Sequence, residues 1–227
     1  MAQARRLLLA ALLVLSLAAC GGGGDDEPEA TTTEAAATTS VAEAGPCETV
    51  EAPAAKPDGG EEAPTVPLDT AKTWELAVET NCGPFTIALD LAKAPKTAAS
   101  LVSLAQNGFF DGTTFHRVVP GFVIQGGDPT GTGTGGPGYQ TIDVPPAGTA
   151  YTEGVVAMAK AGTDPPGSAG SQFFVVTGAD VGLPPEYAVV GKVTEGMATI
   201  RAIDALGVGD APPSQPVVIE KVTVRNG

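Results

Sequence analysis

The segment Phe115–Asp128 has the sequence FHRVVPGFVIQGGD and gives the clearest indication of the fold. Two runs rich in β-forming residues flank the pair Pro120-Gly121, which is a strong turn signal. The stretch therefore predicts a β-hairpin or a sharp corner between two strands.

Alternation of side chains between the two faces of a strand indicates which residues of this hairpin lie together. One face of the first run carries Phe115, Arg117 and Val119, and one face of the second run carries Val123 and Gln125. A guanidinium group, an amide and apolar side chains are therefore expected side by side.

A second run, Ser171–Val176 (SQFFVV), shows the same pattern. Its alternation points Gln172 and Phe174 one way, and Phe173 and Val175 the other. An apolar floor with a few fixed polar groups is typical of a ligand pocket.

Three segments together resemble the signature segments of cyclophilins, the peptidyl-prolyl cis-trans isomerases. They are Phe115–Asp128, Met158–Gly162 (MAKAG) and Ser171–Phe174 (SQFF), and their order and spacing also match. The resemblance extends from about Trp74 to Arg225, roughly two thirds of the chain.

Many short strands and two well-separated helices predict a mainly β fold, a closed antiparallel barrel without exposed edges. The resemblance implies eight strands, with one helix covering each end of the barrel. The expected helices cover about 95–106 and 197–206, and the expected strands outside the two runs above cover 74–79, 85–89, 154–159, 186–193 and 217–225.

The resemblance also implies an activity, the isomerisation of Xaa-Pro bonds in proline-containing polypeptides. In that role Arg117 donates to the imide nitrogen, and Gln125 holds Arg117 and bonds a peptide carbonyl. The residues expected to line the proline slot are Phe122, Val123 and Phe174. No covalent step or cofactor is required. The alternative is a module that holds proline-containing segments without turnover.

Further substrate contacts follow from the same resemblance. Ala159 and Lys160 are expected to offer backbone groups to the residues before proline, with Gln172 beside them. Gly182 or Leu183 falls where many family members carry Trp, and Tyr187 falls where many carry His; Leu183 and Tyr187 are expected to contact the substrate. The other interpretation of the slot is a plain core around Phe122 and Phe174, with Arg117 as a solvated residue or half of a surface ion pair.

Other chemistries find little support. His116 is the single histidine, no cysteine pair has metal-ligand spacing, and we expect no metal site. Ser171 lacks the Gly-Xaa-Ser-Xaa-Gly context of a hydrolase nucleophile. The glycine-rich stretch 126–139 contains no lysine, so it predicts a loop at the rim of the substrate groove and not a phosphate-binding loop.

Residues 1–19 have the features of a secretory signal, with Arg5-Arg6 before the apolar run Leu7–Ala19. This run is shorter than the roughly 20 residues that cross a bilayer. Leu17-Ala18-Ala19-Cys20 resembles a bacterial lipobox, which implies acylation of Cys20 and an extracytoplasmic protein anchored to the cell membrane by lipid. The alternative is cleavage near Cys20 and release.

Residues 20–68 are predicted to form an acidic, low-complexity tether, and residues 69–227 a single domain. Lys56 is the one basic residue of the tether, and the chain carries a net charge of −14, which argues against nucleic acid as a partner. We expect a monomer. Cys47 and Cys82 are expected either to form a disulfide, as export favours, or to remain free thiols.

Overall fold

The computed structural model describes residues 46–227. The predicted signal segment 1–19, the acylation site Cys20 and the tether up to residue 45 lie outside the described residues. Between residues 46 and 227, no helix has the length and apolar character needed to cross a membrane.

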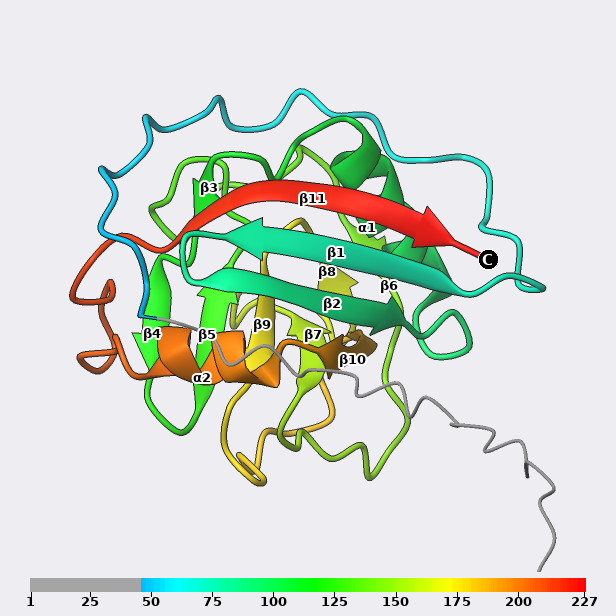
Figure 1. Ribbon diagram of the computed structural model, residues 1–227. Coiled ribbons are helices and arrows are strands. Elements are labelled where there is room, and N and C mark those ends of the chain that lie inside the picture. The colour runs from blue at the N-terminus through cyan, green and yellow to red at the C-terminus, as the bar shows by residue number, and fades with distance from the viewer. Residues whose placement is uncertain (1–45) are drawn as a thin grey trace, which may run out of the picture. The chain divides into compact units, whose positions relative to one another are not determined.

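The domain is built on one antiparallel sheet of nine strands, seen in Figure 1. From one edge to the other the strands follow the order β3 (Thr113–Thr114), β11 (Val218–Asn226), β1 (Trp74–Thr80), β2 (Gly83–Leu89), β10 (Val189–Glu195), β7 (Val155–Met158), β9 (Phe173–Val176), β5 (Val123–Gly126) and β4 (Arg117–Val119). A separate small sheet pairs β6 (Thr141–Ile142) with β8 (Ser168–Ala169).

The expectation of a closed eight-stranded barrel is wrong, because the sheet is open between β3 and β4. These two edge strands are consecutive in the chain and are separated by Phe115 and His116 alone. The chain leaves β11 after Phe115, whose backbone N–H donates to Val217 O at 2.9 Å, and then pairs with β5 from Arg117 onward. β3 and β4 are thus two parts of one short stretch. They follow each other end to end, so no ladder of hydrogen bonds joins these two edges.

The two predicted helices are confirmed as α1 (Pro95–Gln106) and α2 (Met197–Asp204). Pro95 opens α1, where its missing N–H costs no hydrogen bond. The buried stripe of α1 packs against β11 and β6, whereas α2 packs against β2, β4 and β5. α2 ends two residues before the expected Leu206.

Two apolar clusters lie on opposite faces of the strands that carry the predicted site. Ile124 and Phe173 belong to the larger, inner cluster, whereas Val123 and Phe174 belong to the smaller one. The alternation predicted for β5 and β9 is therefore correct. Phe115 is an exception, because it is buried in the inner cluster with its ring 5.9 Å from that of Phe173 and does not share the face of Arg117. The break between β3 and β4 interrupts the alternation at this point.

Residues 46–68, which we call the strap, lie along the domain without forming a helix or a strand. In Figure 1 the strap, blue to cyan, passes around the outside of the sheet before β1 begins. Its backbone N–H groups donate at Glu48 to Asn81 O, at Lys56 to Pro129 O and at Gly59 to Gly136 O, over 2.8–2.9 Å. This part of the predicted tether is thus held against the domain.

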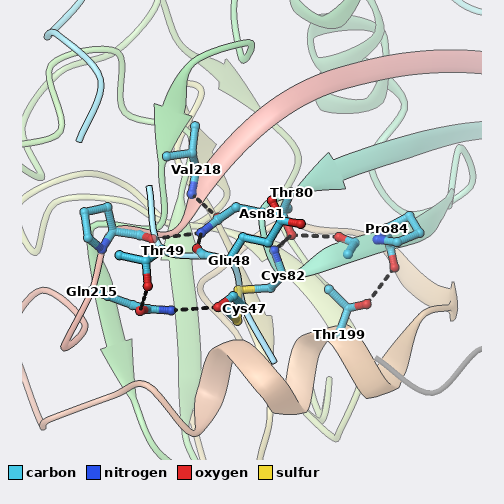
Figure 2. Close-up of a disulfide and its surroundings, with 12 residues drawn as sticks. Cys47, Glu48, Thr49, Thr80, Asn81, Cys82, Pro84, Thr199, Gln215 and Val218 are labelled. Atoms are coloured by element: carbon cyan, nitrogen blue, oxygen red, sulfur yellow. Dashed lines mark hydrogen bonds between the residues drawn. A yellow bond between two sulfur atoms is a disulfide. The ribbon is translucent and has the colours of Figure 1, made fainter. Parts of the chain in front are cut away.

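Cys47 and Cys82 form a disulfide that joins the start of the strap to the turn between β1 and β2, as Figure 2 shows. Asn81 reinforces the junction, since its Nδ2 donates to Glu48 O at 2.7 Å and to Pro216 O at 3.1 Å. Its Oδ1 accepts from Val218 N at 2.8 Å. Three separate segments therefore meet at this turn.

Candidate active site

One row of residues crosses the strands β4, β5, β9 and β7. Arg117 lies opposite Gln125, Gln125 opposite Phe174, and Phe174 opposite Ala157. The turn at Pro120-Gly121 sets this register, and Gly121 adopts a φ of 68°, which favours glycine. The predicted hairpin thus places the guanidinium, the amide and an aromatic ring side by side.

A chain of hydrogen bonds orients the polar members of the row. Arg117 Nη1 donates to Gln125 Oε1 at 3.4 Å, and Gln125 Nε2 donates to Gln172 Oε1 at 3.0 Å. Gln172 Nε2 donates in turn to Gly135 O at 2.9 Å. Each amide uses its oxygen toward one neighbour and its NH₂ toward the other, so the direction of the whole chain is fixed.

Arg117 has two further contacts, and its side chain is 31% exposed. Its Nε donates to the carboxylate of Asp210 in an ion pair. Its Cζ lies 6.0 Å from the centroid of the Phe122 ring, within the range of a cation–π contact. The guanidinium therefore lies over one wall of the predicted proline slot.

Asp210 is a site residue that the sequence analysis missed. It lies in the segment between α2 and β11, 93 residues after Arg117, and its side chain is 76% exposed. No local pattern marks an exposed aspartate in a loop, so the single available signal was the general expectation that Arg117 could join a surface ion pair.

The predicted apolar wall residues gather in the smaller cluster. Val123 and Phe174 are buried there, and Phe122, Leu183 and Tyr187 pack against them while half-buried. The ring of Tyr187 meets that of Phe174 edge-on, with centroids 5.7 Å apart. The half-buried members are the ones that a bound ring could touch.

Ala159 and Lys160 directly follow β7, and the backbone contacts with substrate that the sequence suggests for them stay a prediction. The backbone N–H of Ala159 donates to Gln172 O at 2.9 Å, so the domain itself uses that group. The Lys160 side chain is 4% exposed, with Nζ 3.1 Å from a carboxylate oxygen of Glu186 and 5.5 Å from the Tyr187 ring centroid. Lys160 thus braces the wall at Tyr187.

Asp128 organises the loop behind this site. It is fully buried and accepts hydrogen bonds from the backbone N–H groups of Thr130, Gly133 and Gly135. Burial alone would raise the pKa of Asp128, but these hydrogen bonds outweigh it and hold that pKa below its usual value. The loop in turn presents the Gly135 carbonyl to Gln172.

His116 lies outside the chain of hydrogen bonds at the site. Both of its ring nitrogens are buried without a hydrogen-bond partner, and burial lowers the pKa of His116 despite the opposing charge of Asp128. No group of three or more metal-ligating side chains occurs among residues 46–227.

Comparison with known proteins identifies relatives over most of this domain. The family model described as cyclophilin type peptidyl-prolyl cis-trans isomerase/CLD matches residues 75–224. Peptidyl-prolyl cis-trans isomerase A of Mycobacterium tuberculosis is 40% identical over 177 residues, covering 70% of this chain and 94% of the relative. Peptidyl-prolyl cis-trans isomerase B of Bacillus subtilis is 52% identical over 106 residues, covering 46% of this chain and 71% of the relative.

A solved structure shares the fold. A cyclophilin type peptidyl-prolyl cis-trans isomerase of Cryptosporidium parvum superposes with a TM-score of 0.62 at 30% identity, covering 67% of this chain and 98% of that chain. The same relative was also crystallised in the presence of the dipeptide Ala-Pro, with a TM-score of 0.61 and coverage of 66% of this chain and 98% of that chain.

Proposed function

The chain belongs to the cyclophilin-type peptidyl-prolyl cis-trans isomerase family, and we propose that Arg117 and the apolar wall around Phe174 carry out the isomerisation. The chain is a peptidyl-prolyl cis-trans isomerase by this membership. The proposal concerns which of its groups act and in what way.

The reaction requires no bond to be broken at the peptide. Amide resonance imposes a rotational barrier of about 18–20 kcal/mol, so an Xaa-Pro bond isomerises over tens of seconds or longer without help. When the imide twists, its nitrogen loses conjugation, becomes pyramidal and gains basic character. A fixed donor aimed at that nitrogen lowers the barrier because it interacts more strongly with the twisted form than with the planar one.

Arg117 is the proposed donor. Its guanidinium is anchored on one side by Gln125 and on the other by Asp210, and it lies over the Phe122 ring. The proline ring rests against the half-buried surface of the smaller cluster, formed by Phe122, Leu183 and Tyr187 with Phe174 beneath. The single observation that carries this assignment is the row that places Arg117, Gln125 and Phe174 opposite one another on adjacent strands.

The proposed cellular role is assistance in the folding of exported proteins, by a monomer anchored through a lipid on Cys20 outside the cytoplasmic membrane. The signal-like segment at residues 1–19 and the lipobox-like residues Leu17 to Cys20 support this location. The disulfide between Cys47 and Cys82 fits an oxidising compartment. Membrane fractionation of Cys20→Ala against the unaltered chain tests it, since loss of the anchor should release the protein.

The mechanistic test compares Arg117→Ala with the unaltered enzyme on an Ala-Pro-containing peptide. Removal of one preorganised donor should lower kcat/KM by about 10²–10³-fold. Arg201→Ala is the matched control and should leave the rate unchanged, because Arg201 lies exposed on α2, where it pairs with Glu153. Equal rates for Arg117→Ala and the unaltered enzyme would contradict the proposal and leave only the binding of proline-containing segments.

A further inference from the structure

A groove of about 430 Å³, which we call the apolar groove, lies apart from the catalytic row. Its walls come from residues 64–67 of the strap, from the start of α1 and from residues 140–142, which include β6. Lys96, in the first turn of α1, is the single charged residue that lines it. No residue of the catalytic row takes part in this groove.

The apolar groove gathers hydrophobic side chains that the domain leaves in solvent. Val66 is 75% exposed and Ile142 is 48% exposed, and both line the groove. Val144, two residues after Ile142, is 61% exposed. These are three of the four large hydrophobic residues that are exposed within residues 46–227. Single exposed hydrophobic residues are common, but a group of them beside a groove indicates an interaction site.

The strand that lines the groove, β6, has one unpaired edge. It pairs with β8 on its other edge, where Ile142 lies opposite Ser168. The N–H of Asp143 donates to Gly167 O at 3.1 Å, so the backbone groups of Asp143 point toward β8. Because these groups alternate along an antiparallel strand, those of Ile142 point to the opposite edge, where no strand pairs within residues 46–227. An unpaired edge is a template for one more extended strand.

The strap does not supply that strand. Proline has no backbone N–H, so Pro64 and Pro67 cannot donate to a neighbouring strand. The strap is instead held on either side of this segment. The N–H of Glu61 donates to Pro137 O at 3.0 Å, and Leu68 packs against the larger apolar cluster. The groove is therefore kept open by a wall that is anchored at both ends.

The apolar groove adjoins a second groove that borders the catalytic row, which we call the row groove. The row groove has a volume of about 700 Å³ and is lined by Gln125 of the row and by Asp58 of the strap. Gln140 lines both grooves, so a polypeptide that leaves the site through the row groove reaches the apolar groove at this residue. The strap wall precedes residue 75, where the match to the family model begins, and is an addition of this chain to the matched domain.

We propose that the apolar groove is a second binding site for the substrate polypeptide, and that it holds an extended apolar segment ahead of the isomerised proline. The backbone of this segment pairs with the free edge of β6, and its side chains pack against Val66 and Ile142. The occupant is part of an unfolded polypeptide, because it must offer free backbone N–H groups and exposed apolar side chains together. This inference rests on the proposed function, because the segment belongs to the same polypeptide as the proline.

Fluorescence anisotropy with a labelled Thr-Val-Thr-Val-Thr-Val peptide tests the site without any proline. The unaltered enzyme should bind this peptide and should not bind Thr-Ser-Thr-Ser-Thr-Ser. Val66→Asp should weaken the binding at least about 10-fold, because an unpaired charge is costly to bury against apolar side chains. Thr223→Asp is the matched control. It adds the same charge at an exposed position of β11 that does not line the groove, and its affinity should be unchanged.

Two variants of Ile142 separate the backbone contact from the apolar one. Ile142→Pro removes the N–H at the free edge without adding charge, and it should weaken binding of the apolar peptide. Ile142→Val keeps the N–H and an apolar side chain, and it should bind as the unaltered enzyme does. Each variant should keep the kcat/KM of the unaltered enzyme for the short peptide Ala-Ala-Pro-Phe, which shows that the domain is folded.

A linked substrate tests the continuity of the two grooves. The apolar hexapeptide is joined ahead of Ala-Ala-Pro-Phe through Gly-Ser linkers of increasing length. At the best linker length KM should fall by about 10-fold relative to the short peptide, with kcat unchanged, because the second contact becomes intramolecular. An equal fall in KM when the hexapeptide is joined after the proline would contradict the placement of the segment ahead of it.

The outcomes separate this inference from the proposed function. Absence of binding of the apolar peptide to the unaltered enzyme, or equal binding to Val66→Asp, would overturn the second site and leave the isomerase mechanism intact. Self-association of the enzyme that Val66→Asp abolishes, without binding of the peptide, would overturn it in favour of a second copy of the chain. Arg117→Ala should bind the apolar peptide normally while losing turnover, and full turnover in that variant would instead contradict the proposed mechanism.

Discussion

The catalytic row and the strap are held in place by two different physical means. The row is fixed by strand register, since each residue from Arg117 to Phe174 has a neighbour assigned by a continuous hydrogen-bonded ladder. The strap has no regular structure and is fixed at separate points, by Cys47, Lys56 and Asp58. Register fixes the position of the row through many backbone hydrogen bonds, whereas each anchor of the strap depends on one side chain.

This difference matters because the two regions meet at one groove. The row should tolerate changes in the strap, and the strap should detach in stages as its anchors are removed. Changes at Phe174, at Cys47 together with Cys82, at Lys56 and at His116 test this contrast between the two regions.

Phe174→Ala should cause the largest loss of stability, about 3–5 kcal/mol, because it empties a buried aromatic position in the middle of the row. Urea denaturation measures the loss. Phe122→Ala is the control within the same cluster, and it should cost less because Phe122 is only half-buried. A loss below about 1 kcal/mol for Phe174→Ala would show that the row does not depend on its central ring.

Replacing Cys47 and Cys82 together by Ser should lower the free energy of unfolding by roughly 3–4 kcal/mol, the chain-entropy estimate for a separation of 35 residues. Isomerisation of an uncharged peptide should persist, because neither cysteine lies on the strands that carry the row. Chemical denaturation with and without reductant measures the stability, and the unaltered chain under reductant should approach the double variant. Loss of isomerase activity in a folded double variant would show that the two regions are not separable.

Lys56→Met should cost about 2 kcal/mol through loss of charged hydrogen bonds. Lys56 Nζ donates to the carbonyls of Gly108, Phe109 and Asp111 over 2.6–3.1 Å, just beyond the end of α1. Hydrogen exchange of the strap amides should increase locally, while the amides of β5 and β9 stay protected. Lys72→Met, at an exposed position, should leave both stability and exchange unchanged.

His116→Phe should have the smallest effect, visible only as a change in pH dependence. Burial lowers the pKa of His116 in the folded state, so the unfolded chain takes up the proton first as pH falls below about 6.5. Stability is therefore complete above that pH and declines as pH falls toward the folded-state pKa. Because His116 is the single histidine, the variant should remove the decline between pH 6.5 and 5. An equal decline in His116→Phe would assign it to another group.

The sequence predicted the row better than the strap for the same physical reason. Alternation about Pro120-Gly121 is a local rule, and it placed Arg117, Gln125 and Phe174 on one face correctly. It was wrong for Phe115, where the ladder breaks. The prediction of a closed barrel was wrong, because a sequence motif does not show that one short stretch supplies both edge strands of the sheet.

The contacts of the strap could not be predicted, because they join side chains to distant backbone groups. Lys56, the one basic residue of an acidic segment, donates hydrogen bonds to three carbonyls more than 50 residues away, and no periodic pattern in the sequence indicates this contact. Asp210 was missed for the same reason. Only the cysteine count pointed toward the junction at Cys47 and Cys82.

That junction also determines how mechanical force enters the domain. Tension on the polypeptide ahead of Cys47 would pass through the sulfur–sulfur bond directly to Cys82, between β1 and β2. Residues 48–81, which lie between the two cysteines, form a loop that the disulfide bypasses and that carries no load. The strap wall of the apolar groove would thus keep its shape when the molecule is pulled from that end.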